Sequence, residues 1–98
     1  MDIEFMRHGI RFVANRDKAR NNPRKHGVSF EQAAEAFFDP FLKIIDASRQ
    51  DETRDALIGC DDTGRLLFVV HLLFEDECIR LISARRATRE EHRLYENG

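Results

Sequence analysis

A long apolar segment in the second half of the chain constrains the fold more than any other feature. Residues 66–74 are apolar throughout, interrupted only by His71. Because successive strand residues face opposite sides of a sheet, this pattern predicts a central strand that is buried on both faces. The acidic residues 75–77 connect it tightly to a second apolar segment, residues 78–84. Such a short connection joins antiparallel strands, so the two segments predict a hairpin inside an antiparallel sheet.

Further strands are predicted upstream of this hairpin. Residues 41–45 and residues 53–58 are strand-like, and Gly59 is predicted to stop the second of them. Together with the hairpin they form an antiparallel meander of four strands. Residues 10–14 alternate weakly and predict a short edge strand. Residues 1–9 are polar and aperiodic, and we expect them to be an N-terminal extension of the domain.

Helix signals follow the first predicted strand. Asn15 or Asp17 can cap a helix that begins near Arg16, since their side-chain oxygens accept hydrogen bonds from amides of the first turn. Pro23 disfavours helical geometry at Asn22, so this helix is predicted to end or kink there.

Two capping boxes predict two more helices. After Gly27, which is typical of a helix stop, Ser29 and Gln32 open the clearest one. Its apolar face recurs with helical spacing at Phe30, Ala33, Ala34 and Phe37. Thr88 and Glu91 open a final helix that extends to about residue 96.

These elements predict an α+β fold in the order β-α-α-β-β-β-β-α. It is an antiparallel sheet of four to five strands with two N-terminal helices and one C-terminal helix. Ninety-eight residues, 42% of them apolar, make a single domain spanning residues 1–98. Cys60 and Cys78 lack the spacing of a zinc site and suit a reducing compartment. Without a signal peptide or a membrane-spanning apolar run, we expect a cytoplasmic protein.

The net charge of −2 conceals a segregation along the chain. Residues 1–27 carry seven Lys or Arg and three Asp or Glu, residues 28–62 carry three and nine, and residues 63–98 carry six and six. A basic patch can form if the first and last segments meet, and the acidic middle could face a basic partner. The alternative is a well-mixed solvated surface.

Arginines dominate the candidate chemistry. Arg85 and Arg86 follow the last predicted strand and form a phosphate-sized cation site on a rigid support. One should face the helix layer and the other the open face, and Arg80 is predicted to share a face with Arg86 rather than Arg85. Arg54 can reach the same open face, where paired arginines would stabilise a scissile phosphate. The alternative is surface ion pairing with carboxylates.

Three other side chains have two interpretations each. Lys25 and His26, at the end of the first helix segment, suit phosphate contact and proton transfer, because histidine moves protons at neutral pH. They could instead interact with the helix C-terminal carbonyls. Tyr95 could stack on a base or support proton transfer, or it could pack against the sheet. His71, inside an apolar strand, is expected to be a hydrogen-bonded core residue.

Three blocks of the chain, covering residues 12–95, resemble the BrnT family, toxins of type II toxin–antitoxin systems with a RelE-like ribonuclease fold. The first block comprises Lys18, Asn22, Arg24-Lys25-His26-Gly27-Val28-Ser29-Phe30, Phe37 and Asp39. The second comprises Arg54, Leu57-Ile58-Gly59 and residues 66–71. The third comprises Ile79-Arg80-Leu81-Ile82-Ser83-Ala84-Arg85-Arg86-Ala87, Glu90, Arg93 and Tyr95.

The resemblance implies an endoribonuclease that cuts mRNA and inhibits translation, without metal or other cofactor. The RNA 2′-hydroxyl would attack the adjacent phosphate. The implied partner is a cognate antitoxin with a ribbon-helix-helix DNA-binding part, forming a hetero-oligomer with the toxin. Promoter DNA would be contacted only through the antitoxin. The implied catalytic residues are Arg54, Arg85, His26 and Lys25, and the implied RNA-binding residues are Arg80, Arg86, Tyr95 and Lys18.

The chain departs from the family pattern before the first helix. Where the family has Phe-x-Trp-Asp, this sequence has Phe12-Val13-Ala14-Asn15, and Pro23 stands where a helix residue is usual. Loss of the tryptophan removes a large packing or stacking surface. The alternative to an active toxin is therefore a catalytically weakened or inactive homologue that binds the antitoxin as a co-repressor module.

Overall fold

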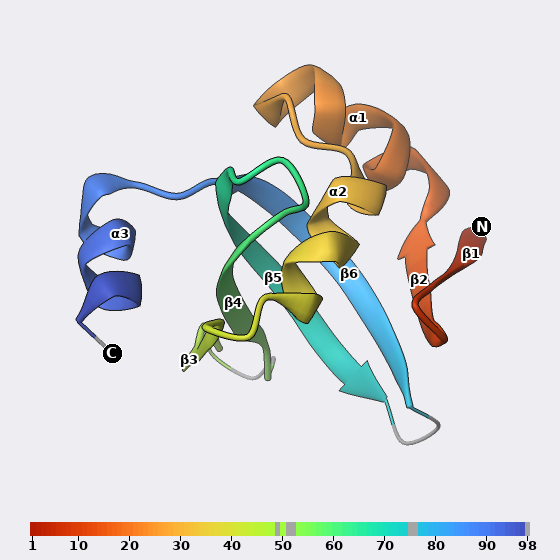
Figure 1. Cartoon of the computed structure of the whole chain (residues 1–98). Coiled ribbons are helices and arrows are strands. Elements are labelled where there is room, and N and C mark those ends of the chain that lie inside the picture. Colours follow the sequence, from red (N-terminus) through yellow and green to blue (C-terminus); the bar gives the residue numbers. More distant parts are fainter. Residues whose placement is uncertain (49, 51–52, 75–76, 98) are drawn as a thin grey trace.

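The computed structural model describes residues 1–48, 50, 53–74 and 77–97. Over these residues the chain forms one six-stranded sheet in the order β1-β2-β6-β5-β4-β3, with three α-helices and one 3-10 turn. The strands are β1 (Asp2–Arg7), β2 (Ile10–Asn15), β3 (Lys43–Asp46), β4 (Asp55–Cys60), β5 (Leu66–Phe74) and β6 (Cys78–Arg86). The helices are α1 (Arg16–His26), α2 (Phe30–Glu35) and α3 (Arg89–Glu96), and the 3-10 turn is η1 (Ala36–Phe38). Figure 1 shows α2 over one face of the sheet and α1 beyond the end of β2, whereas α3 lies apart from them beyond β4.

The predicted α+β class and the antiparallel meander are confirmed, but the sheet has six strands where four to five were predicted. β3, β4, β5 and β6 pair antiparallel in chain order, and β5 lies at the centre of the meander. β2 pairs parallel to β6, so it is an inner strand and the prediction of an edge strand is wrong. Residues 75 and 76 of the predicted acidic connection lie outside the described residues.

The N-terminal residues form a strand, so the prediction of an extension at residues 1–9 is wrong. β1 pairs antiparallel with β2 along its whole length. Ile3 and Phe5 are partly buried against the core, and Phe5 stacks on Phe12 with ring centroids 5.5 Å apart. His8 and Gly9 have φ angles of 51° and 82°, and two positive φ angles are what a two-residue hairpin turn requires.

α1 continues past Pro23, so it does not end at Asn22, the first of the two outcomes predicted there. Asn15 caps its start as predicted, accepting hydrogen bonds from the Asp17 and Lys18 amides at 2.9 and 3.1 Å. Gly27 ends it with φ 69°. The side chain of Asn22 is buried and hydrogen-bonded to two other segments, and these bonds hold the turn that Pro23 would otherwise loosen.

Of the two predicted capping boxes, the one that opens α3 is complete, and the one that opens α2 has only one of its two hydrogen bonds. Thr88 and Glu91 form the complete box that opens α3. Ser29 accepts a hydrogen bond from the Gln32 amide at 3.1 Å, but the Gln32 side chain turns away to Asp61 and Asp62. α2 begins where it was predicted to begin. It ends earlier than predicted, because the chain passes into η1 after Glu35.

Gly59 lies inside β4 and does not stop it, contrary to prediction. A Cβ placed on Gly59 would lie 2.7 Å from the carbonyl oxygen of Ala36. Glycine therefore allows η1 to pack directly on the strand. Side chains from α2, η1, the covered sheet face and the connection before α2 form the core: Phe12, Ala14, Val28, Phe30, Ala33, Ala34, Ala36, Leu57, Leu67, Val69, Leu81 and Ala84.

His71 belongs to this interior, as predicted. It is 1% exposed, its Nδ1 lies 3.2 Å from the Val69 carbonyl oxygen, and its ring meets the Phe37 ring edge-on at 4.8 Å. Burial lowers the pKa of His71, so it stays neutral in the core. Within the described part of the chain, no helix combines the length and apolar character needed to cross a membrane.

Candidate active site

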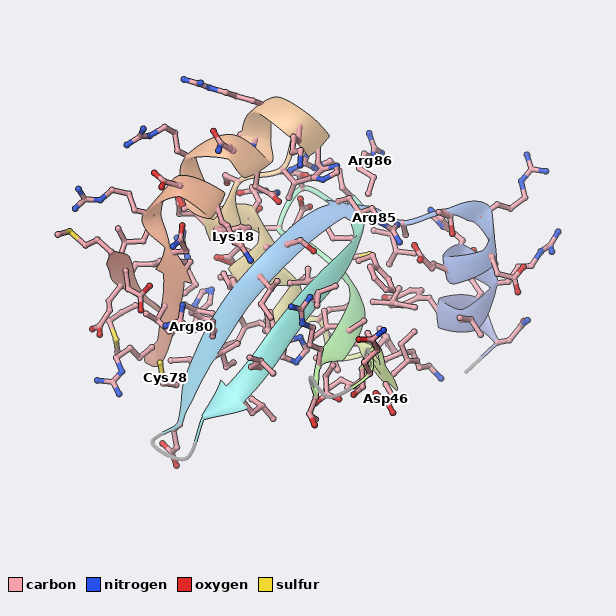
Figure 2. All side chains as sticks on the ribbon, turned by 180° about the vertical axis from the view of Figure 1, so that it is seen from behind. Lys18, Asp46, Cys78, Arg80, Arg85 and Arg86 are labelled. Carbon is pink, nitrogen blue, oxygen red and sulfur yellow. The ribbon has the colours of Figure 1, made fainter. Side chains whose placement is uncertain are left out.

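The face of the sheet opposite α2 carries a cleft of about 730 Å³. Its three sides come from segments far apart in the sequence. α1 contributes Lys18, Asn21, Asn22, Lys25 and His26. The end of β3 and the start of β4 contribute Ile45, Asp46, Ala47, Ser48 and Arg54. The floor is formed from β5 and β6 by Phe68, Val70, Ile82, Ser83 and Arg85. The open face of these strands is turned toward the viewer in Figure 2.

Asn22 fixes the α1 side of the cleft. β2 pairs with β6 only as far as Leu81, which leaves the edge of β6 without a strand partner beyond that residue. Beyond Leu81 the side chain of Asn22 pairs with this edge in place of a strand. Its Nδ2 donates to the Ala84 carbonyl at 2.8 Å, and its Oδ1 accepts from the Ala84 amide at 3.2 Å. Nδ2 also donates to the Val28 carbonyl at 2.7 Å. α1 is thus locked beside β6, and Figure 2 shows Lys18 between them.

Ser48 fixes the opposite side of the cleft. The Arg54 amide donates to the Ser48 hydroxyl oxygen at 3.1 Å, and the Ala47 amide donates to the Arg54 carbonyl at 3.0 Å. These bonds hold Arg54 just ahead of β4, across the cleft from α1. Ser48, through its hydroxyl and its amide, also holds the pKa of Asp46 below its ordinary value, so Asp46 is ionised at neutral pH.

Arg85 is held from two sides at the floor of the cleft. Its Nη1 and Nη2 donate to the two carboxylate oxygens of Glu91, each at 2.8 Å. Its Cζ lies 4.3 Å from the centroid of the Phe68 ring, a cation–π contact. The bond to Glu91 raises the pKa of Arg85. Burial opposes a charged Glu91, but hydrogen bonds from Arg85 and Thr88 outweigh it and lower the pKa of Glu91.

A β-bulge changes which arginines share a face. Val70 pairs with Ser83 but the next residue, His71, pairs with Leu81, so Ile82 is an extra residue in β6. The strand alternation therefore shifts by one. Arg85 pairs with Phe68 and Arg80 with Leu72, four residues along β5, so Arg80 and Arg85 lie on the same face.

The prediction that Arg80 shares a face with Arg86 is thus wrong, since a uniform alternation cannot anticipate a bulge. Arg86 pairs with the core residue Leu67, on the other face from Arg85, as predicted for that pair. Arg80 lies outside the cleft and forms an ion pair with Asp2, whereas Arg86 is exposed beyond the cleft rim. Figure 2 shows Arg85 and Arg80 toward opposite ends of β6.

Five of the eight predicted site residues meet in the cleft: Lys18, Lys25, His26, Arg54 and Arg85. Arg80, Arg86 and Tyr95 do not. Tyr95 donates from its hydroxyl to Asp39 at 2.6 Å, and this bond raises the pKa of the phenol above its ordinary range. This bond ties α3 to the segment between η1 and β3.

The side chains of Lys25 and His26 have no hydrogen bond or ion pair within the described part of the chain. They therefore make no hydrogen bond to the helix C-terminal carbonyls, although both lie among the basic residues of the last turn of α1, where the helix dipole favours cations. Both are exposed and border the cleft. They are placed to meet a ligand that enters it.

Cations gather in the cleft although the whole chain is acidic. Among the residues that the structure describes, Lys18, Lys25, Arg54 and Arg85 line it together with one carboxylate, Asp46. The predicted meeting of the first and last segments, as α1 and β6, is therefore confirmed. A positive cleft of this kind suits a phosphate-bearing ligand.

Sequence reasoning missed Asp46, Phe68 and Glu91. Asp46 belongs to no motif, and Phe68 is one of many apolar residues in a central strand. Glu91 was recognised as a helix cap, but nothing local indicated its bond to Arg85. Among the described residues, no group of three or more His, Cys, Asp or Glu side chains is arranged to hold a metal ion.

One comparison with known proteins identifies a relationship. The family described as "Ribonuclease toxin, BrnT, of type II toxin-antitoxin system" matches residues 15–91. This range contains all the described residues that line the cleft, together with Glu91. No curated protein matches the chain.

Proposed function

The chain belongs to the BrnT family of ribonuclease toxins of type II toxin–antitoxin systems, and from this premise we propose that the cleft is where it cleaves RNA. The observation that carries this proposal is the gathering of Lys18, Lys25, Arg54 and Arg85 in one cleft of a chain with net charge −2. Arginine and lysine are the side chains that bind phosphate. The proposed activity is endonucleolytic cleavage of mRNA, which inhibits translation and arrests growth.

The proposed reaction uses the RNA's own nucleophile and no metal ion. A base takes the proton of a 2′-hydroxyl, and its oxygen bonds to the adjacent phosphorus. The bond from phosphorus to the 5′-oxygen then breaks, and an acid protonates that oxygen. The products are a 2′,3′-cyclic phosphate and a 5′-hydroxyl. Arg54 and Arg85 would stabilise the negative charge that the phosphorane-like transition state gains.

Two groups in the cleft are candidates for proton transfer. His26 is exposed at the rim and has no hydrogen-bond or ion-pair partner among the described residues, and histidine is the side chain that most often transfers protons in catalysis. Asp46, which is ionised at neutral pH, is a second possible acceptor. Lys18 and Lys25 would bind the RNA backbone. Arg80, Arg86 and Tyr95, which lie outside the cleft, would at most contact flanking RNA.

Membership of a type II system implies an antitoxin partner. We propose a hetero-oligomer in which the antitoxin covers the cleft and carries a ribbon-helix-helix DNA-binding part. Promoter DNA would then be contacted only through the antitoxin.

The departures from the family pattern do not reach the cleft. Ala14 is fully buried in the core, and Asn15 caps α1 in place of aspartate. Pro23 is exposed and α1 continues through it. The chain therefore accommodates these residues as structural substitutions, which favours an active toxin over an inactive co-repressor module.

The test is incubation of the purified protein with an mRNA transcript in the presence of EDTA, beside an Arg54→Ala/Arg85→Ala variant of verified fold. We expect cleavage by the wild type, 2′,3′-cyclic phosphate ends, and a strong loss in the variant. Absence of cleavage by both, with retained binding to a co-expressed antitoxin, would favour the co-repressor module.

A further inference from the structure

We infer that Glu91 is a positioning residue for RNA cleavage, which orients Arg85 so that one edge of its guanidinium faces the scissile phosphate. This inference rests on the proposed function. Glu91 lies in the first turn of α3, outside the cleft lining, so it would act through Arg85 and not by touching RNA.

The hydrogen bonds of Arg85 divide its guanidinium into two edges. A guanidinium has five N–H donors. Nη1 donates to Glu91 Oε1 at 2.8 Å and to the Arg86 carbonyl at 3.2 Å, and Nη2 donates to Glu91 Oε2 at 2.8 Å. Among the described residues, Nε and the second hydrogen of Nη2 have no acceptor. These two parallel donors form the side edge, which can bind two oxygens of one phosphate.

Glu91 is itself rigidly held. Its Oε1 accepts from the Thr88 amide at 2.8 Å, and its own amide donates to the Thr88 hydroxyl at 3.2 Å, which completes the capping box of α3. Its side chain is 13% exposed. Phe68 supports the guanidinium plane of Arg85 from β5. The contact with Phe68 therefore sets the plane of the Arg85 guanidinium, and the bonds to Glu91 set its rotation within that plane.

A different role for the same bond would be competition, in which the Glu91 carboxylate must leave before phosphate can bind. The geometry favours positioning, because Glu91 binds the end of the guanidinium, at Nη1 and Nη2, and leaves the side edge open. The two roles predict opposite results. Loss of a positioning group slows cleavage, whereas loss of a competing group strengthens RNA binding or speeds cleavage.

The experiment compares Glu91→Gln with two matched controls. Glutamine also serves in capping boxes, so this variant keeps the helix cap and removes the ion pair. Glu90→Gln removes the same charge from the same turn, where Glu90 is exposed and pairs with Arg93. Thr88→Ala weakens the cap and leaves the bond between Glu91 and Arg85.

Two quantities are measured for each variant. One is the single-turnover cleavage rate of an mRNA transcript, and the other is affinity for the same transcript with 2′-O-methyl groups, which block the nucleophile. We expect Glu91→Gln to cleave about 10- to 100-fold more slowly, the scale of loss seen when a reacting group is misplaced. Its affinity for blocked RNA should change little, and both controls should cleave like the wild type.

Wild-type rates for Glu91→Gln, or equal losses in Thr88→Ala, would overturn the inference and leave the proposed function standing. Tighter binding or faster cleavage by Glu91→Gln would assign the competing role. Absence of cleavage by the wild type would instead contradict the proposed function.

An NMR measurement tests the orientation of Arg85 without relying on cleavage. A guanidinium held by a bidentate carboxylate rotates slowly, so its Nη hydrogens give separate resonances. We expect resolved Arg85 Nη signals in the wild type and in Thr88→Ala, and their collapse in Glu91→Gln. Equal signals in all three proteins would contradict a positioning role.

Discussion

The side-chain amide of Asn22 pairs with both backbone polar atoms of Ala84, as a neighbouring strand would. It does so where β2 stops pairing with β6, and this places α1 and its lysines beside Arg85. One buried side chain thus joins the N-terminal segment to the strand that carries the proposed phosphate site.

Replacement of Asn22 by alanine should therefore destabilise the fold strongly. It would leave the amide and carbonyl of Ala84 and the carbonyl of Val28 without their partner. Unsatisfied buried groups of this kind cost about 1–3 kcal/mol each, with partial relief from water, so we expect a total loss of about 3 kcal/mol. Urea denaturation would measure it, with the exposed neighbour Asn21→Ala as the control. Similar stabilities of the two variants would contradict this role.

RNA affinity should depend on salt through the residues of the cleft. Neutralising one phosphate contact on single-stranded nucleic acid lowers the salt slope by about 0.7. We expect Lys25→Gln to weaken binding to 2′-O-methylated RNA and to reduce the slope by about that amount. Arg20→Gln, also exposed on α1 but outside the cleft, should retain the wild-type slope. Equal changes in the two variants would indicate a diffuse charge effect.

The turn before β5 should make stability depend on acid. Asp61 has a fully buried side chain. Burial alone would raise its pKa, but hydrogen bonds from Thr63 and Arg65 outweigh burial and lower the pKa to about 2. Because the folded-state pKa lies below the ordinary value, the stabilisation is complete above about pH 4 and is lost as the pH falls toward 2.

The lowered pKa of Asp61 contributes about 2 kcal/mol to the free energy of unfolding at neutral pH. Denaturation midpoints measured from pH 6 to pH 2 should fall steeply for the wild type. Asp61→Asn should be less stable near neutral pH and should fall less. Asp62→Asn, whose carboxylate is exposed, serves as the control. A wild-type acid profile in Asp61→Asn would contradict the assignment.

Tyr95 should matter for stability and not for cleavage. Its hydroxyl donates to Asp39 and ties α3 to the segment before β3. We expect Tyr95→Phe to lose about 1.5–3 kcal/mol of unfolding free energy, the usual contribution of a hydrogen bond to a charged group. The variant should cleave RNA at the rate of the wild type. A large loss of rate would contradict this prediction and indicate that Tyr95 contacts RNA.

Local signals in the sequence predicted most of the elements. The apolar run of β5, the Asn15 cap of α1, and the capping box of Thr88 and Glu91 each act over a few residues, so they are legible without tertiary structure. β1 was missed although Ile3 and Phe5 alternate with Asp2 and Glu4 and are the residues that turn toward the core. α1 was shortened because Pro23 is a strong local signal, which the buried bonds of Asn22 override.

The site was predicted by residue type and only partly by position. Lys25, Arg54 and Arg85 were recognised from motifs, but their meeting depends on pairing between distant strands. The extra residue Ile82 in β6 has no local signature, and it decides the face of Arg80. Asp46 and Phe68 acquire their places only when β3 and β5 lie opposite α1.

The most direct test of the account compares Arg85→Ala with Arg86→Ala. The two neighbours carry the same charge, but Arg85 lies on the floor of the cleft and Arg86 is exposed outside it. Both variants, after circular dichroism confirms their folds, would be incubated with an mRNA transcript in EDTA. We predict a loss of at least about 100-fold in the single-turnover rate for Arg85→Ala, in line with removal of a transition-state charge contact. Arg86→Ala should cleave nearly like the wild type. Equal rates for the two variants would contradict the assignment of the cleft as the RNA-cleaving site.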